Sequence, residues 1–268
     1  MIRKPAVAGQ FYPGSKEHLT EDVKNRTLHP QGVRRSVIGV VSPHAGYIYS
    51  GDVAGAVLSS IEIPERVIVI SPNHTGMGDP AAIMVEGQWQ LPTGPIPIDS
   101  DIALDLTKEC SELHNDYKAH LMEHSLEVQL PFLQCLQQRL KMVPITVSHV
   151  RFDICEKIGN AIADVIKKTG EKILIVASSD MTHYEPQEFV KKKDKMAIYK
   201  VIALDPKWLL DTCATEKITM CGVVPTAIML VAAKKLGARK GELVKYATSG
   251  DVNKEYSAVV GYSGIIVY

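Results

Sequence analysis

Three histidines follow three short apolar runs in the same way, and this repeated placement is the strongest chemical signal in the sequence. SVIGVVS precedes Pro-His44, RVIVIS precedes Pro-Asn-His74, and KILIVAS precedes Ser-Asp-Met-Thr-His183. Runs of this kind are typical of strands buried on both faces. Ligands of open α/β sheets bind beyond the carboxyl ends of parallel strands. We therefore expect the three imidazoles to converge at one edge of a sheet.

Imidazoles in such a place suggest a metal site. Imidazole suits iron, copper, zinc and nickel, and a thiolate shifts the preference toward softer ions such as copper(I) or zinc. Two histidines with one anionic group leave coordination positions open, as a catalytic or transfer site requires. Cys221 stands in MCGVVP, a turn before a helix expected from Pro225, where a helix N-terminus stabilises a thiolate. The other four cysteines are scattered, form no C-x-x-C pair and are expected to pack as ordinary residues.

Acidic residues beside two histidines allow proton transfer. In EHSLEVQLPFL, His124 and Glu127 are three apart, so a helix would place them on one face. That face could supply a carboxylate or a substrate-binding imidazole to the cleft, or it could be a solvated first turn whose acids the helix dipole favours. Asp180 and His183 are also three apart. Asp180 could orient His183 as a general acid/base unit or cap a helix, and both interpretations stay open.

The elements that must position these residues alternate between strands and helices. This order predicts an α/β three-layer sandwich with a central, mainly parallel or mixed sheet and helices on both faces, in a single domain spanning 1–268. The Gly- and Pro-rich segment Gly76–Pro97 contains AAIMVE and is expected to hold a short hairpin. The expected strands are Ser36–Ser42, Arg66–Ser71, Met142–Val147, Lys172–Ser178, Leu243–Thr248 and Ser257–Val267. The expected helices are Gly51–Ile61, Ser100–Glu109, His124–Arg139, Asp153–Lys168, Glu188–Ala203 and Pro225–Leu236.

Composition and missing motifs exclude several classes. Lys+Arg and Asp+Glu balance at 30 each over 268 residues, so no bulk field attracts nucleic acid or an anionic membrane. No apolar run reaches the roughly 20 residues that cross a bilayer, and the start lacks a signal-peptide core, so we expect a cytoplasmic protein. The absence of P-loop and G-x-G-x-x-G motifs argues against a nucleotide cofactor. The absence of a G-x-S-x-G elbow argues against an α/β-hydrolase.

With these motifs in view, the sequence resembles the Memo family along almost its whole length. The resemblance rests on seven ordered stretches, which are RKPAVAGQFYP, SPHAGYIYSG, SPNH, EHSLEVQLPFL, SSDMTH, CGVVP and the closing YSG. It implies a fold like that of class III extradiol dioxygenases, which open catechol rings with non-haem iron(II).

The resemblance also implies a site. The metal ligands of the family correspond to His44, His74 and Cys221, with iron(II) or copper(I) as the expected ion. His183 corresponds to the acid/base histidine of the dioxygenases, within the motif that contains Asp180, and His124 corresponds to another histidine of the pocket. Because Cys221 stands where the dioxygenases have a carboxylate, extradiol cleavage does not follow, and a thiolate can itself be oxidised.

Three functional hypotheses follow, and the sequence does not rank them. The first is a metal-dependent redox protein, which leaves open whether the chain is an enzyme. The second is a non-enzymatic binding or adaptor module whose cleft takes a peptide or small ligand, with Tyr47, Tyr49 and Tyr184 as walls. The third is a metal carrier. Relatives in animals are described as phosphotyrosine-peptide adaptors, and microbial relatives tend to be encoded beside a radical-SAM protein, which hints at a shared pathway.

Overall fold

A computed structural model describes residues 1–27 and 33–268, and its centre is a mixed sheet of nine strands. Four parallel strands form the middle of the sheet in the order β2 (Gly39–Ser42), β9 (Ile173–Ser178), β3 (Arg66–Pro72) and β8 (Lys141–Val147). Beside β2 lies β12 (Val259–Val267), which is antiparallel to it, and β12 in turn pairs antiparallel with β11 (Gly241–Thr248) and β10 (His183–Glu185). Beside β8 lie β4 (Ala81–Ile83), which is antiparallel to it, and then β7 (His114–Asn115).

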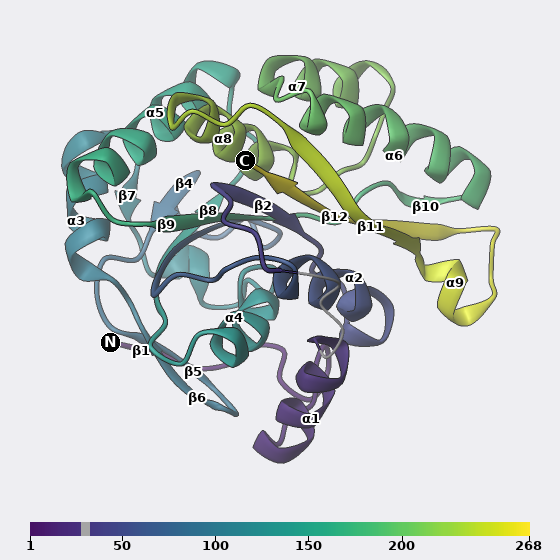
Figure 1. Ribbon diagram of the computed structural model, residues 1–268, viewed down its shortest axis with the longest axis horizontal. Coiled ribbons are helices and arrows are strands. Elements are labelled where there is room, and N and C mark those ends of the chain that lie inside the picture. The colour runs from purple at the N-terminus through teal and green to yellow at the C-terminus, as the bar shows by residue number, and fades with distance from the viewer. Residues whose placement is uncertain (28–32) are drawn as a thin grey trace.

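Helices cover both faces of this sheet, as Figure 1 shows. One face carries α2 (Tyr47–Ser59), which packs against α1 (Lys16–Thr27) and α4 (Leu130–Leu136). The other face carries α8 (Val223–Lys235), packed between the strands and α5 (Phe152–Thr169). This layer is completed by α3 (Ser100–Glu109), α6 (Gln187–Ile202) and α7 (Pro206–Thr215). The expected three-layer α/β sandwich is therefore confirmed.

Smaller elements complete the described chain. A separate three-stranded sheet contains β1 (Ile2–Arg3), β5 (Gln88–Leu91) and β6 (Gly94–Pro97). The short helix α9 (Ser249–Asn253) precedes β12, and two single 3₁₀ turns lie at Lys118–His120 and Glu127–Gln129.

Burial explains why the central strands read as unbroken apolar runs. Every residue of β9 is buried, and β3 is buried from Val67 to its end, because helices cover both faces of these strands. The helix α8 is buried nearly all round, since it packs on the sheet, on α5 and on α7. It therefore lacks the polar face that a surface helix shows.

The helix expected over His124–Arg139 is wrong in its first half. The chain instead makes the 3₁₀ turn Glu127–Gln129 and begins α4 at Leu130, with Pro131 in its first turn. A helix from His124 would place Pro131 in its interior, where the missing N–H and the ring clash would break it. His124 therefore lies in a loop rather than on a helix face.

Other boundaries differ by a few residues. The strand expected over Ser36–Ser42 begins at Gly39, and the helix expected over Gly51–Ile61 begins at Tyr47. The hairpin within Gly76–Pro97 joins β5 to β6, whereas the AAI of AAIMVE forms β4 of the main sheet. The helices α1, α7 and α9 and the strands β1, β7 and β10 were not predicted. Across the described ranges, no helix combines the length and the apolar character needed to span a bilayer.

Candidate metal centre

His44 leaves the end of β2, and its hydrogen bonds fix which ring nitrogen carries the proton. Its Nδ1 lies 2.8 Å from the Oγ of Ser178, the last residue of β9. The Ser178 hydroxyl donates its only proton to the Ser125 carbonyl at 2.7 Å and accepts from Gln129 Nε2 at 2.9 Å. His44 Nδ1 must therefore donate to Ser178, which leaves a lone pair on Nε2. That Nε2 lies 3.2 Å from the Sγ of Cys221.

His74 is oriented in the same manner by a buried carboxylate. Its Nδ1 lies 2.9 Å from Oε1 of Glu123, and its backbone N–H donates to Oε2 at 2.6 Å. Ser125 adds donors from its backbone N–H and its hydroxyl to Oε1. Burial alone would raise the pKa of Glu123, but the hydrogen bonds from His74 and Ser125 outweigh it and lower that pKa to about 2. An ionised Glu123 accepts the Nδ1 proton of His74 and leaves its Nε2 free.

Cys221 reaches the two histidines because the turn before α8 packs closely on the end of β9. The N–H of Gly222 donates to Ser179 Oγ at 3.0 Å. A Cβ at position 222 would lie 2.2 Å from the Ser178 carbonyl oxygen, so only glycine fits there. The ligand atoms of His44, His74 and Cys221 all lie within 4.8 Å of one another.

Burial dominates the protonation of this group. It lowers the pKa of His44 well below its usual range, and the nearby His124, His74 and His183 add to that effect. Burial, followed by the charge of Asp180, raises the pKa of the Cys221 thiol. The expected stabilisation of a Cys221 thiolate by the helix N-terminus is therefore outweighed in the metal-free protein, because the sulfur is withdrawn from water.

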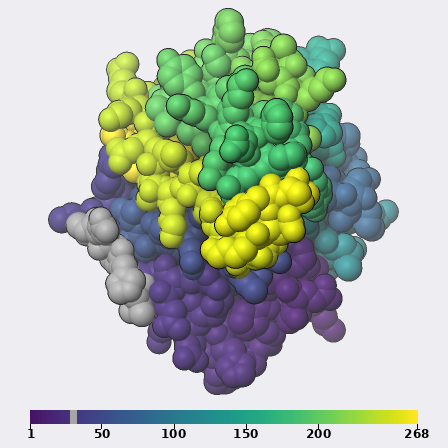
Figure 2. All heavy atoms as spheres, turned by 90° about the vertical axis from the view of Figure 1, so that its right-hand side faces the viewer, coloured from purple at the N-terminus to yellow at the C-terminus, as the bar shows by residue number. Residues whose placement is uncertain are grey.

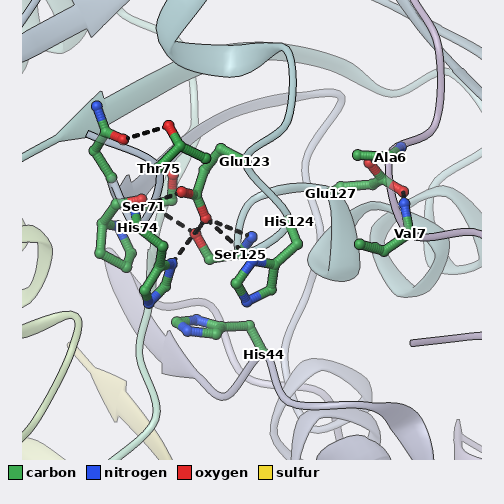
Figure 3. Close-up of polar contacts among 12 residues, drawn as sticks. Ala6, Val7, His44, Ser71, His74, Thr75, Glu123, His124, Ser125 and Glu127 are labelled. Carbon is green, nitrogen blue, oxygen red and sulfur yellow. Dashed lines mark hydrogen bonds and ion pairs between the residues drawn. The ribbon is translucent and has the colours of Figure 1, made fainter. Parts of the chain in front are cut away.

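His124 lies within this cluster and Glu127 does not (Figure 3). The ring of His124 stacks on that of His74, with centroids 4.8 Å apart, and its centroid is 5.6 Å from that of His44. Glu127 instead accepts from the backbone N–H groups of Ala6 and Val7. The expectation that His124 and Glu127 share one face is wrong, because the chain is not helical at His124, and the carboxylate beside the histidines is Glu123.

Asp180 and His183 do not form the expected pair, and among the residues that the structure describes Asp180 caps no helix. Asp180 Oδ1 accepts from the backbone N–H groups of His44, at 2.7 Å, and Ala45, at 3.3 Å. Burial raises the pKa of Asp180 to about 6. His183 Nδ1 donates to the carbonyl of Thr219 at 2.9 Å, which leaves Nε2 as the free nitrogen. Asp180 thus fixes the loop of His44, and Thr219 orients His183.

A pocket of about 580 Å³ opens onto the three histidines and His183. Its walls come from distant parts of the chain, which Figure 2 shows meeting on one face as purple N-terminal, green and yellow segments. Of the tyrosines expected as walls, Tyr49 and Tyr184 line this pocket. Tyr47 does not, because its ring is buried and its hydroxyl donates to the Val128 carbonyl. The other aromatic residues of the lining are Phe11 and Tyr262.

Several residues that orient the site were missed from the sequence. Gln129 belongs to a segment that was expected to be one long helix, and Thr219 had no distinguishing signal. Ser178 was detectable in principle, since it ends an apolar run next to the run that precedes His44, and the two strands pair with Ser42 opposite Ser178.

Comparisons with known proteins identify the family of the chain and agree with this fold. The family model described as Memo-like protein matches residues 3–266. A MEMO1 family protein of Methanopyrus kandleri is 42% identical over 99% of both chains, and one of Methanococcus maripaludis is 42% identical over the full length of both. A crystal structure of an uncharacterized protein from Escherichia coli K12 superposes with a TM-score of 0.59 at 12% identity, covering 86% of this chain and 99% of that one. At that identity the match concerns the fold alone.

The fold and the site define a three-layer α/β protein with imidazoles and one thiol gathered at the carboxyl edge of its parallel strands. Within that class, the chain belongs to the Memo family.

Proposed function

We propose that His44, His74 and Cys221 bind one iron(II) or copper(I) ion that serves a redox reaction. The observation that carries the proposal is the orientation of the donors. Ser178 and Glu123 hold the Nδ1 protons of the two histidines, so both Nε2 lone pairs are free, and one of them points at the Cys221 sulfur from 3.2 Å. Histidine ligands of metals are typically oriented by such a second hydrogen bond.

The donor set fits these ions. Two neutral imidazoles and one thiolate suit copper(I) and iron(II), and three protein ligands leave room for a further ligand. The raised pKa of Cys221 means that metal binding must displace the thiol proton, so affinity should increase with pH. A bound ion would supply one-electron chemistry or activation of a small molecule at this point.

The surrounding residues have roles of their own in this proposal. Asp180 holds the backbone of His44 and Ala45 in place. His183 lines the same pocket with its Nε2 free, so it can accept or return a proton of a bound molecule. His124 packs on His74 and restricts the rotation of that ring.

The proposal is tested by anaerobic titration with iron(II) and copper(I), in which binding is measured by calorimetry and by the absorption band of the metal-bound thiolate. Cys221→Ala should lose the thiolate band and most of the affinity. Cys135→Ala is the matched control, because Cys135 is also half-buried but lies in α4. Equal binding by wild type and Cys221→Ala would remove Cys221 from the site.

The second candidate function is a binding module that needs no metal. The observation in its favour is Tyr184, which lines the pocket, is 76% exposed and has a φ of 58°. Such a backbone is uncommon for a bulky residue and is often found at functional sites. Peptide or small-molecule binding that persists after complete metal removal would favour this function.

A further inference from the structure

The candidate metal centre lies between two pockets. His44, His74 and His183 line the pocket of about 580 Å³ described above. His74 and Cys221 also line a second pocket of about 770 Å³, at the carboxyl ends of β3 and β8. A molecule in this second pocket therefore contacts two of the three proposed ligands from another direction.

The second pocket is apolar over most of its lining. Its walls come from the end of β8, the start of α5, the helix α7 and the turn before α8. The apolar side chains that form them include Val147, Val150, Phe152, Leu210, Ile218 and Met220. Its volume is in the range that encloses a small organic molecule, and such sites are usually apolar with a few placed polar groups.

The pocket offers two cations to which an anion can bind. Arg151 and Lys207 line it, against the single carboxylate of Asp211. Lys207 pairs with Asp211, and Arg151 pairs with Asp153. The Arg151 side chain is 85% exposed, and those of Asp153, Lys207 and Asp211 are 45–52% exposed. Because ion pairs in contact with water contribute little, both cations can exchange partners. The first turn of α5, which begins at this pocket, adds the positive end of an 18-residue helix, which Asp153 in the same turn partly offsets.

We propose that this second pocket binds an apolar organic acid. The carboxylate lies among Arg151, Lys207 and the start of α5. The hydrocarbon lies against the apolar walls, beside Cys221 and His74. The inference names the substrate class of the proposed metal site and rests on the proposed function for any reaction, although binding itself requires no metal.

The test uses the full-length, metal-free protein and calorimetric titration with octanoate, with octylamine as the matched cation. Octanoate should bind, and octylamine should bind at least about fivefold more weakly, because its charge meets two cations. Ala214→Trp, which adds an indole to the lining of the second pocket, should weaken octanoate binding at least about tenfold. Ala258→Trp is the control, because Ala258 is also exposed but lines the first pocket, and it should leave binding unchanged.

Three results would overturn the inference. These are no octanoate binding, equal binding of octylamine, or loss of binding in Ala258→Trp rather than in Ala214→Trp. Because the titration contains no metal, its failure would leave the metal site intact. A failure of the metal titration would equally leave this pocket intact.

Discussion

Glu123 accepts hydrogen bonds from both the backbone N–H and the imidazole of His74, at 2.6 and 2.9 Å. This pairing ties a buried loop residue to a histidine that follows β3. It fixes the position of the His74 backbone and the tautomer of its ring together, so the geometry of the candidate metal centre depends on a residue that is not one of its ligands.

Replacing Glu123 by glutamine should weaken metal binding about 10- to 100-fold. The amide has one acceptor oxygen and carries no charge, so it cannot hold both N–H groups of His74 as the carboxylate does. Anaerobic titration of Glu123→Gln against wild type measures the change. The exposed Glu86→Gln serves as a control. Unaltered affinity in Glu123→Gln would show that the carboxylate does not orient the ligand.

Asp180 should make the metal-free protein less stable as the pH rises from about 4 to about 6. Its pKa is raised from 3.8 to about 6 by burial, so in this window the native state holds a proton that the unfolded state has released. Stability falls with pH wherever the native state binds more protons. Asp180→Asn keeps an acceptor oxygen for His44 and removes this titration. Thermal unfolding from pH 4 to 8 should show that the free energy of unfolding of Asp180→Asn increases relative to that of wild type by up to about 3 kcal/mol as the pH rises. If the free energies of unfolding of the two proteins changed with pH in parallel, the assignment would be contradicted.

Arg3 should be essential to the stability of the loop that carries Glu123 and His124. It is fully buried, stacks 4.1 Å from the Trp89 ring, forms an ion pair with Glu127, and donates to the Glu123 carbonyl at 2.7 Å. Arg3→Met would leave the charge of Glu127 buried without this partner. Removing one partner of a buried pair costs about 3–5 kcal/mol.

Urea unfolding measures this cost, and the neighbouring exposed residue supplies the control. Lys4→Met should change the free energy of unfolding by no more than about 0.5 kcal/mol. A loss in Arg3→Met as small as that in Lys4→Met would refute the role of Arg3.

His183 should prove dispensable for metal binding although it lines the same pocket. Its Nδ1 is held by the Thr219 carbonyl, and it is not in the group formed by His44, His74 and Cys221. His183→Ala should therefore bind iron(II) or copper(I) as wild type does, whereas His74→Ala should lose most of its affinity. Loss of binding in both variants would make His183 a ligand and change the proposed coordination.

The sequence predicted well which histidines lie at the carboxyl edge of the sheet, because an apolar run and the residues that follow it are local features. The flanking runs placed these histidines correctly: His44 and His74 come after the parallel strands β2 and β3, and His183 comes after the loop that follows β9. The family and the three-layer fold were predicted correctly. The metal itself and the roles of these residues remain predictions.

The contacts that orient the site could not be read from local pattern. Whether Glu123 or Glu127 faces the histidines depends on where α4 begins, and Pro131 decides that. Glu127 instead accepts hydrogen bonds from the Tyr12 hydroxyl and from the backbone of the N-terminal segment, more than a hundred residues away in the chain. The binding of Asp180 to the His44 backbone likewise arises only when two strands pair in register.

The most direct test is a crystal structure of the protein soaked anaerobically with iron(II) or copper(I), with anomalous data collected at the absorption edge of the metal. We predict one peak bonded to Nε2 of His44, Nε2 of His74 and Sγ of Cys221, with Ser178 and Glu123 still hydrogen-bonded to the Nδ1 atoms. A fully loaded crystal with the metal bound elsewhere, or with no bond to Cys221, would contradict this prediction.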